Sequence, residues 1–562
     1  MTDFTQFKLP YRPAAEFQQS VAYFSMEFGI DQALRIYSGG LGYLAGSHMR
    51  SAYALQQNLV GIGILWKYGY YDQVRRDNGE MTHQFRERLY NFLQPTDLKF
   101  QITVHGAPVW VTAYYLAPEV FGTAPMFLLS TDLAENDFLS RTISNRLYDN
   151  NVETKVAQCI LLGQGGAKLL EALRWEPEIY HLNEAHALPA AFHLLHKFDG
   201  NADRLRERLV FTTHTPVEAG NEKHAFDLLS RMSFFGGVSD ARVREIAGVE
   251  GEIFSHSLVA LRLAKVANGV SKIHGHVSRR MWEVHDRCAP ITHVTNSQNH
   301  AFWHDPQLDA ALKTDHDAAL RARKIELKKH LFEIVADQTG RLFDPEVLTV
   351  VWARRFAAYK RADLITRDLA AFKALIAQEK RPIQIIWAGK PYPQDHGAVD
   401  LFNHLIHFSK SYANLAVLTG YEMHLSKALK QGSDIWLNNP RVPREASGTS
   451  GMTAAMNASV NLSTHDGWVP EFNRQGENGW MIPPVDLTWS FEQQDETDRV
   501  NLLKILNDEI LPTYYDQPER WWQIVKNSMR EVTPYFDSDR MAREYYERVY
   551  RAPVHAPMMF EV

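Results

Sequence analysis

From about residue 150 onward, short β-rich apolar runs alternate with stretches of helical periodicity. This alternation is typical of parallel sheets flanked by helices, and the early chain shows it less cleanly. Polar, charged and glycine residues follow each apolar run, at the strand ends where ligand crevices form in open α/β sheets. The runs that we predict as strands are 178–182, 208–212, 291–295, 348–352, 383–388, 415–418, 435–437 and 460–463.

Two large α/β domains follow from this pattern. Residues 305–335 are charge-rich and helical in periodicity, and we interpret them as one long helix near the domain junction. The predicted domains are therefore 1–296 and 297–562, meeting across a cleft. The amphipathic stretch 519–550 should form two helices, because Pro534 interrupts it.

Composition and charge narrow the class of protein. The 562 residues carry 60 Lys and Arg against 66 Asp and Glu, a net charge of −6 that argues against a nucleic-acid partner. Cys159 and Cys288 cannot build a disulfide framework, which favours a reducing, cytoplasmic location. The N-terminus lacks the pattern of a signal peptide, and the longest dense apolar stretch, 59–66, is too short for a membrane span.

A glycine-rich string, 38–42, precedes a run that reads as helical from Tyr43. Gly39, Gly40 and Gly42 would let backbone N–H groups approach an anion at the positive end of that helix. The alternative is an ordinary tight turn, which is the commoner role of such a segment. The string therefore predicts a phosphate site only if other residues also indicate phosphate.

A cluster of cations follows the predicted strand 348–352. Arg354, Arg355 and Lys360, with Arg361 next to them, lie in one short segment. Guanidinium forks and an ammonium charge suit a phosphate group, whereas an exposed, charged helix face is the alternative. The position directly after a buried strand favours phosphate.

The most distinctive string is 445–452, which places a carboxylate, hydroxyls and two glycines ahead of a predicted helix, 453–458. A sugar or a phosphate could use all of these groups. The alternative is a capped helix, in which Ser or Thr is the N-cap residue. A cap accounts for the hydroxyls but leaves Glu445 and the repeated glycine unexplained.

The histidines give weaker signals. His214 follows the predicted strand 208–212 and could act as an acid, a base or a ligand, although a structural hydrogen bond is the usual role of any one of 24 histidines. His186, His193 and His196 have no cysteine or acidic cluster near them in the sequence. We therefore expect no metal site.

Ordered strings along nearly the whole chain resemble the α-glucan (glycogen and starch) phosphorylases, particularly their compact bacterial and archaeal type. The resemblance implies two Rossmann-like domains facing a deep cleft, the GT-B architecture, with C-terminal helices that cross back to the first domain. It also implies a homodimer, since members are often dimers. The strings are 23–29, 38–42, 182–184, 212–216, 268–271, 359–361, 436–440, 445–452, 527–530 and 540–541.

The resemblance further implies an activity, the cleavage of an α-1,4-glucan by phosphate to give glucose 1-phosphate with retention of configuration. Carried over by position, one set of residues holds the sugar and another holds the phosphate. The sugar set is Glu445, Ser447, Gly448, Asn296 and Tyr421, with His214 near the reacting carbon. The phosphate set is Arg355, Lys360, Arg354, Thr449, Ser450 and the backbone of Gly39, Gly40 and Gly42.

The sequence departs from the family at Thr453, where members carry the lysine that forms a Schiff base with pyridoxal phosphate. A threonine hydroxyl cannot form an imine, so covalently held pyridoxal phosphate is excluded at this position, whereas non-covalent binding stays open. Further departures are Ser47, Arg50, Ser297 and Arg354. The sugar and phosphate positions are retained while the cofactor pocket is altered.

Three hypotheses follow for this chain. It is a retaining glycosyltransferase that acts as an α-glucan phosphorylase, with loosely held pyridoxal phosphate or another anion. Alternatively, it transfers sugar from a sugar-nucleotide donor to a glucan or other sugar acceptor, without pyridoxal phosphate. The third hypothesis is an inactive glucan-binding protein, which would have no reason to keep clustered charges that lower stability.

Overall fold

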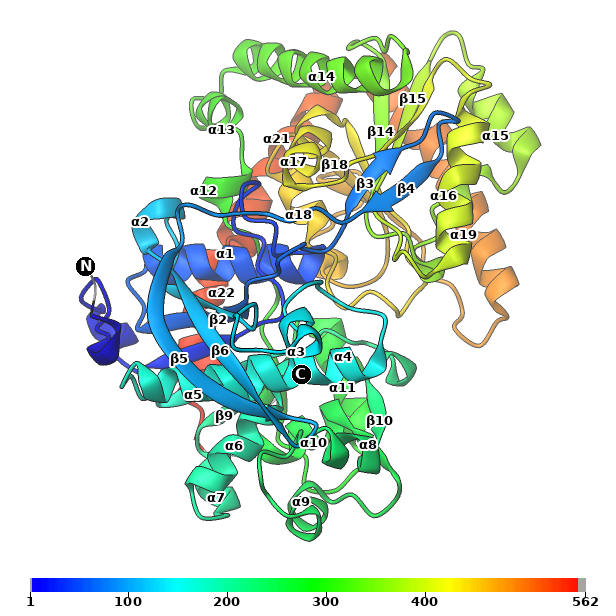
Figure 1. Ribbon diagram of the computed structural model, residues 1–562. Coiled ribbons are helices and arrows are strands. Elements are labelled where there is room, and N and C mark those ends of the chain that lie inside the picture. Colours follow the sequence, from blue (N-terminus) through cyan, green and yellow to red (C-terminus); the bar gives the residue numbers. More distant parts are fainter. Residues whose placement is uncertain (1–2, 554–562) are drawn as a thin grey trace. The chain divides into compact units, whose positions relative to one another are not determined.

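The computed structural model describes residues 3–553, which divide into two compact units (Figure 1). Unit 1 takes in Met1–Tyr71, Phe85–Asn296 and the chain from Ser538 onward. Unit 2 takes in Asp72–Gln84 and Ser297–Asp537. The segment Asp72–Gln84 is a hairpin of β3 (Asp72–Arg75) and β4 (Met81–Gln84), which the sequence pattern does not single out.

Unit 1 is built on a nine-stranded sheet in the order β13-β12-β9-β8-β1-β2-β7-β6-β5. Strands from β13 to β7 pair in parallel, and β6 and β5 add an antiparallel edge. The strand order reverses between β1 and β8, which makes this a topological switch point. The strands are β1 (Val21–Phe24), β2 (Leu59–Ile64), β5 (Gln94–Val104), β6 (Ala107–Leu116), β7 (Met126–Ser130), β8 (Ile179–Asn183), β9 (Leu209–Thr212), β12 (Val266–Gly269) and β13 (Ile291–His293).

Unit 2 contains a six-stranded, fully parallel sheet in the order β16-β15-β14-β17-β18-β19. Numbered along the chain within this unit, the order is 3-2-1-4-5-6, the doubly wound arrangement of dinucleotide-binding folds. Its switch point lies between β14 and β17. The strands are β14 (Leu348–Ala353), β15 (Ile383–Ala388), β16 (Leu415–Leu418), β17 (Ile435–Asn438), β18 (Val460–Thr464) and β19 (Gly479–Ile482).

All eight strands predicted from the apolar runs are present, within two residues at each end. The fold class is confirmed as α/β with parallel sheets. Of the strands in the two large sheets, β1, β2, β5, β6 and β7 in the early chain, and β12 and β19 later, were not predicted. The central strands β14 and β15 are buried at every residue, which explains why they read as continuous apolar runs rather than as alternating patterns.

Helices connect the strands in both units. Those of unit 1 include α1 (Gly40–Ala54), α4 (Val152–Ile160), α6 (Pro189–Lys197), α10 (His256–Leu263), α11 (Lys272–Trp282) and α22 (Ser538–Glu544). Those of unit 2 include α13 (Pro306–Lys313), α14 (Asp317–Thr339), α15 (Leu369–Ile376), α16 (His396–Ser409), α17 (Met423–Gly432), α18 (Ser450–Ala455), α19 (Phe491–Ile505) and α21 (Pro518–Phe536).

Several predicted helix limits are wrong. The expected long helix 305–335 is two helices, α13 and α14, because Asp315 adopts a left-handed backbone conformation between them. The stretch 519–550 does form two helices, α21 and α22, but the break lies at Asp537 rather than at Pro534, since α21 continues to Phe536. Pro534 lies in the last turn, where it removes one hydrogen bond, and buried Val532 and Phe536 keep the turn packed.

The two glycine-rich strings also enter their helices earlier than predicted. Helix α1 begins at Gly40 rather than Tyr43, and α18 begins at Ser450 rather than Thr453. Both helices therefore have candidate site residues in their first turn. The N–H groups of a first turn have no acceptor within the helix and remain available to other partners.

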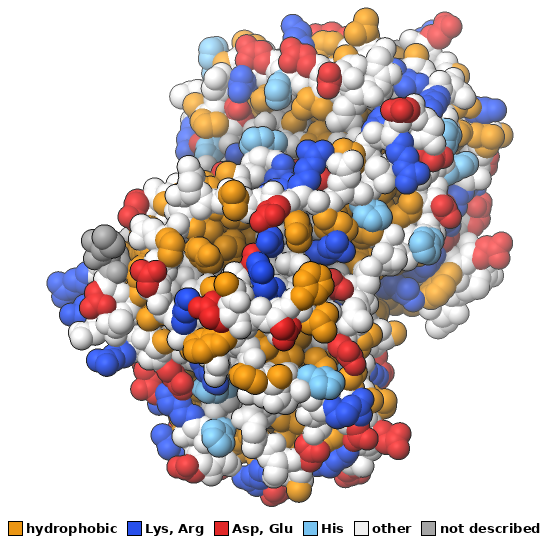
Figure 2. All heavy atoms as spheres, in the orientation of Figure 1, with side chains coloured by type: hydrophobic (Ala, Val, Ile, Leu, Met, Phe, Trp, Pro, Cys, Tyr) orange, Lys and Arg blue, Asp and Glu red, His pale blue; other side chains and the backbone are white. Residues whose placement is uncertain are grey.

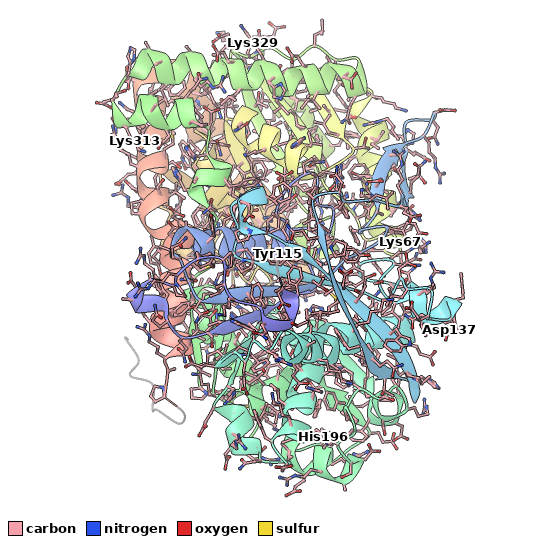
Figure 3. All side chains as sticks on the ribbon, turned by 60° about the vertical axis from the view of Figure 1, so that its left-hand side comes forward. Lys67, Tyr115, Asp137, His196, Lys313 and Lys329 are labelled. Atoms are coloured by element: carbon pink, nitrogen blue, oxygen red, sulfur yellow. The ribbon has the colours of Figure 1, made fainter. Side chains whose placement is uncertain are left out.

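Helix α14 carries both exposed and buried lysine residues. Lys329 projects outward from α14, and Lys313 from α13 (Figure 3). On the inner side of α14, buried Lys328 pairs with Asp434 at 2.5 Å, and buried Lys324 donates to two backbone carbonyls. The lysine ammonium groups that are buried in this helix are thus fixed by partners within the unit.

The surface that Figure 2 shows carries lysine, arginine and acidic side chains interspersed with one another. No single-sign field of the kind that a nucleic-acid partner requires is visible on this face. Within residues 3–553, no helix combines the length and the apolar character needed to cross a membrane.

Candidate active site

The candidate site of unit 2 lies at the carboxyl ends of β14 and β17, on the two sides of the switch point. Arg354 and Lys360 follow β14, and Glu445 follows β17. Ligands of doubly wound sheets bind outside this position, because the connections of the two strands diverge and leave a crevice. The two sequence strings, in which Lys360 and Glu445 are 85 positions apart, therefore meet for a topological reason.

Glu445 is the centre of this cluster. Its Oε2 accepts a hydrogen bond from Lys360 Nζ and lies 3.5 Å from Arg354 Nη1. The side chains of all three residues are nearly buried, between 6% and 11% exposed. Burial alone would raise the pKa of Glu445, but the charges of Lys360 and Arg354 lower it below its ordinary value. The carboxylate therefore stays ionised between two cations.

Polar atoms without partners surround this ion cluster. Among the described residues, Ser447 Oγ, Asn438 Oδ1 and Arg354 Nε are buried and have no hydrogen-bond partner. A Cβ atom added to Gly448 would lie 3.3 Å from Glu445 Cγ and 3.5 Å from Asn438 Nδ2, so these side chains surround the same point. Buried polar groups in native proteins are normally paired, so this set suits a polar ligand.

A neighbouring loop, 466–468, fixes the segment that carries Glu445. Asp466 Oδ2 accepts from the Glu445 N–H at 2.8 Å, and the Trp468 N–H donates to the Ser447 carbonyl at 3.0 Å. Gly467 has φ +61°, and a Cβ there would lie 2.3 Å from the Ser447 oxygen. Burial raises the pKa of Asp466 to about 7, and the nearby charge of Glu445 adds to the shift.

Sequence reasoning missed Asp466 and Asn438 as site residues. Asn438 directly follows the predicted strand 435–437, and Asp466 lies three residues after the predicted strand 460–463, so both stand in polar strings that follow strands. Their position after a strand was the sequence signal that could have identified them as site residues. What the sequence lacked was the pairing of the two strands, which places Asn438 beside Ser463 in the sheet and brings the loops together.

The remaining predicted residues of unit 2 lie around the cluster in different ways. Arg355 is exposed. Burial raises the pKa of Glu445, and the charge of Arg355 lowers it, although less than Lys360 and Arg354 do. Tyr421 is half-buried, and its hydroxyl lies 3.3 Å from Ser426 Oγ. Ser450 Oγ accepts from Trp436 Nε1 at 3.2 Å, and half-buried Thr449 precedes α18.

Arg361, the fourth cation of the 354–361 cluster, does not face a ligand. It is fully buried, with Nη1 2.7 Å from Asp495 and Nη2 2.7 Å from Asp498. Burial would raise the pKa of Asp495, but hydrogen bonds from Arg441, Arg367 and Arg361 lower it to about 2. The expectation that Arg361 contributes to a positive pocket is therefore wrong, because its charge is already compensated.

Thr453 lies in the middle of α18 and is 1% exposed. Its Oγ1 donates to the Ser450 carbonyl at 3.0 Å, within the same helix. Its neighbours Gly451, Met452 and Ala454 are equally buried. The Thr453 side chain is thus packed among its neighbours with almost no accessible surface, and its hydroxyl is occupied.

Unit 1 contains the glycine-rich string, whose N–H groups have an unpredicted partner. The carboxylate of Glu27 accepts from the Ser38 N–H at 2.6 Å, the Gly39 N–H at 3.1 Å and the Tyr148 hydroxyl at 2.8 Å. A Cβ on Gly42 would approach Glu27 Oε2 to 2.7 Å. The Gly39 N–H therefore serves a protein carboxylate, and of the predicted phosphate donors it is Gly40 and Gly42 that lie in the unpaired first turn of α1.

His214 lies at the carboxyl end of the unit 1 sheet, next to its switch point. Its Nε2–H donates to Asn183 Oδ1 at 2.7 Å, and Asn183 Nδ2 donates to Ser25 Oγ at 3.1 Å. Its backbone N–H donates to the carboxylate of Glu184, which has φ +66°. Burial lowers the pKa of His214 to about 3, so the imidazole is neutral at physiological pH.

Asn296 ends unit 1, and its buried Oδ1 has no partner among the described residues. Glu27, Asn183 and Glu184 were not predicted as site residues, although each lies within a string that carries the family resemblance. Across residues 3–553, no group of three His, Cys, Asp or Glu side chains is placed to hold a metal ion.

Comparison with known proteins adds independent evidence on the family of this chain. Residues 236–480 match the family described as carbohydrate phosphorylase. The chain is 46% identical, over 94% of its length, to an uncharacterized protein of Methanocaldococcus jannaschii, and covers 99% of it. It is 32% identical to maltodextrin phosphorylase of Thermococcus litoralis and 30% identical to glycogen phosphorylase of Aquifex aeolicus, over 95% of the chain in each case. It covers 71% and 86% of those two proteins.

Proposed function

The chain belongs to the carbohydrate phosphorylase family, whose members are glycosyltransferases, and on that premise we propose that it is a retaining α-glucan phosphorylase. It would cleave an α-1,4-glucan with inorganic phosphate and release glucose 1-phosphate. The observation that carries this proposal is the buried cluster of Glu445, Lys360 and Arg354 at the switch point, bordered by unpartnered Ser447 and Asn438.

The chemistry suits this set of residues. Phosphorolysis replaces the bond between the anomeric carbon and the glycosidic oxygen by a bond to a phosphate oxygen, and the phosphate proton passes to the departing hydroxyl. The transition state separates a cationic sugar ring from anionic oxygens. Fixed cations in a dry site stabilise such developing charge most strongly, so we assign the phosphate to Lys360, Arg354 and Arg355.

The sugar would occupy the other side of the same cluster. The carboxylate of Glu445 and the free atoms of Ser447 and Asn438 can accept and donate hydrogen bonds to sugar hydroxyls. Ionised Glu445 also compensates the two cations before the substrate arrives. In unit 1, the imidazole of His214 is neutral and already paired through Nε2, which suits a hydrogen-bonding role better than proton transfer.

Covalent pyridoxal phosphate does not fit the residues at position 453. The threonine has no amine, its hydroxyl donates a hydrogen bond within α18, and its side chain is buried. We therefore propose an enzyme that works without a Schiff base. An anionic group bound by Lys360 and Arg354 is compatible with this arrangement.

The proposal is tested by incubating the purified protein with glycogen and phosphate, with and without added pyridoxal phosphate, while glucose 1-phosphate is measured. We expect release in both conditions. Lys360→Met should lower kcat/KM by roughly two to three orders of magnitude, as loss of one charge-stabilising donor does. Lys329→Met, which removes an exposed lysine of the same unit, is the matched control and should leave the rate unchanged.

The competing function is transfer of a sugar from a sugar-nucleotide donor. It is favoured because Thr453 stands where family members carry the Schiff-base lysine, whereas the cations of the site are present. No release of glucose 1-phosphate in either condition would refute the phosphorylase proposal. If a sugar nucleotide then raised the melting temperature of the protein and glucose 1-phosphate did not, the protein would be identified as a transferase that uses a sugar-nucleotide donor. If the protein bound glucan but turned over no substrate, the result would support the third hypothesis, an inactive glucan-binding protein.

A further inference from the structure

An exposed apolar stripe lies beside the candidate site of unit 2. It consists of Leu487, Trp489 and Phe491, whose exposed fractions are 52%, 42% and 52%. The three residues alternate with Thr488 and Ser490. Leu487 and Trp489 lie in the segment that joins β19 to α19, and Phe491 is the first residue of α19. Large apolar side chains at such exposure lose the benefit of burial, so a folded protein gains nothing in stability by presenting three of them together.

The loop that carries the stripe is fixed in its shape. Buried Gln494 donates to the carbonyls of Trp489 at 2.8 Å and Leu487 at 3.4 Å. Ser490 and Gln493 form a capping box at the start of α19. The Thr488 N–H donates to Asp486 Oδ1 at 2.8 Å. The polar residues of the loop therefore hold the backbone, and the apolar residues face outward in a preorganised surface.

Two arginines connect the stripe to Glu445. The guanidinium carbons of Arg441 and Arg444 lie 4.4 Å and 4.9 Å from the centre of the Phe491 ring. Arg441 is also paired with Asp495 at 2.5 Å, which fixes its position. Arg444 directly precedes Glu445 in the chain, and among the described residues its side chain has no hydrogen-bond acceptor.

The sheet explains why the stripe and the site share one side of unit 2. Strand β19 pairs in parallel with β18, which pairs in parallel with β17. The loops that follow these strands therefore leave the same edge of the sheet. The loop that carries the stripe therefore leaves the same edge of the sheet as the loops that carry Arg354 and Glu445.

We propose that Leu487, Trp489 and Phe491, with Arg444, form a binding shelf for the glucan chain outside the reacting sugar. This inference rests on the proposed function for the choice of glucan. The apolar C–H faces of pyranose rings pack on aromatic side chains, and the hydroxyl groups at their rims accept hydrogen bonds from a guanidinium.

The size of the surface favours a sugar chain over a protein partner. Aromatic side chains bury about 150–250 Å² each, and Leu487 is smaller, so the three side chains at about half exposure present no more than roughly 300 Å². A stable protein interface needs about 800 Å² from each partner. A row of a few glucosyl units matches the smaller area.

The test is native gel electrophoresis of the full chain in gels with and without glycogen, which measures binding without turnover. The double variant Trp489→Ala/Phe491→Ala should bind glycogen about tenfold more weakly, equivalent to about 1.4 kcal/mol. Trp489→Phe, which keeps an aromatic face, should restore most of the affinity. Leu342→Ala is the matched control, because Leu342 is 90% exposed and precedes β14, at the amino ends of the strands.

Equal retardation of the wild type and the double variant would overturn the shelf. So would a double variant that changes from dimer to monomer on gel filtration while keeping its glycogen affinity, because the stripe would then join two copies of the chain. The outcome is separable from the proposed function. The protein could bind glycogen through Trp489 and Phe491 and yet release no glucose 1-phosphate. That result would support the proposed binding shelf and refute the proposed phosphorylase activity.

Discussion

Asp466 offers the sharpest test of the electrostatics in unit 2. It is 2% exposed, and its two oxygens accept the N–H groups of Glu445 at 2.8 Å and Gly467 at 2.9 Å. Burial, with the charge of Glu445, raises its pKa to about 7 from an ordinary value of 3.8. The perturbation is Asp466→Asn, which keeps the shape of the side chain and removes its titration.

The sign of the pH effect follows from the raised pKa. The folded protein holds the Asp466 proton more tightly than the unfolded chain, so the free energy of unfolding falls as pH rises from about 4 to about 7. A pKa difference of about 3 between the folded and unfolded chains corresponds to about 4 kcal/mol in full. Between pH 5 and pH 8, the loss of stability from this one group should be about 2 to 3 kcal/mol.

The assay is thermal unfolding of the wild type and Asp466→Asn at about pH 5, 6, 7 and 8, the range across which the group titrates. At about pH 5 the Asp466 carboxyl is protonated and, like the amide, keeps one good acceptor oxygen, so we expect the variant to be less stable than the wild type there by no more than about 1 kcal/mol. The difference in melting temperature should narrow or reverse by several degrees toward the alkaline end. Asp508→Asn, at an exposed position of the same unit, is the control and should follow the wild type. A difference between wild type and Asp466→Asn that is constant across this range would refute the reasoning.

Three further substitutions test other parts of the structure. Thr453→Lys should destabilise the protein by about 1 to 3 kcal/mol, since the added atoms have no space, and should give no borohydride-reducible pyridoxal adduct; a pyridoxyl-labelled peptide spanning position 453 in mass spectrometry would contradict the closed site. Glu27→Gln should cost about 1.5 to 3 kcal/mol, because an amide cannot accept all the bonds that Ser38, Gly39 and Tyr148 donate, and it should loosen the 38–42 loop in hydrogen exchange; unchanged protection there would argue against the role of Glu27. Gly467→Ala should lower the melting temperature by several degrees, because it places a Cβ against the Ser447 carbonyl at a left-handed φ; an unchanged melting curve would show that this loop does not fix the Glu445 segment.

The candidate site could be predicted from the sequence in part. Glu445, Ser447, Arg354 and Lys360 stand in short strings whose composition suits a sugar or a phosphate, and the structure brings these four together. Composition could not distinguish Lys360 from its neighbour Arg361. Their different partners, Glu445 for one and the pair of Asp495 and Asp498 for the other, come from distant segments further along the chain.

Local sequence determined the strands, the α/β class and the family of this protein, because apolar periodicity and short strings depend on neighbouring residues alone. The tertiary structure decided which groups are free to bind. It assigned the Gly39 N–H to Glu27, carried α21 through Pro534 and left Ser447 and Asn438 without partners among the described residues. Each of these outcomes is set by burial and by pairing between distant segments, and neither quantity is contained in a local pattern.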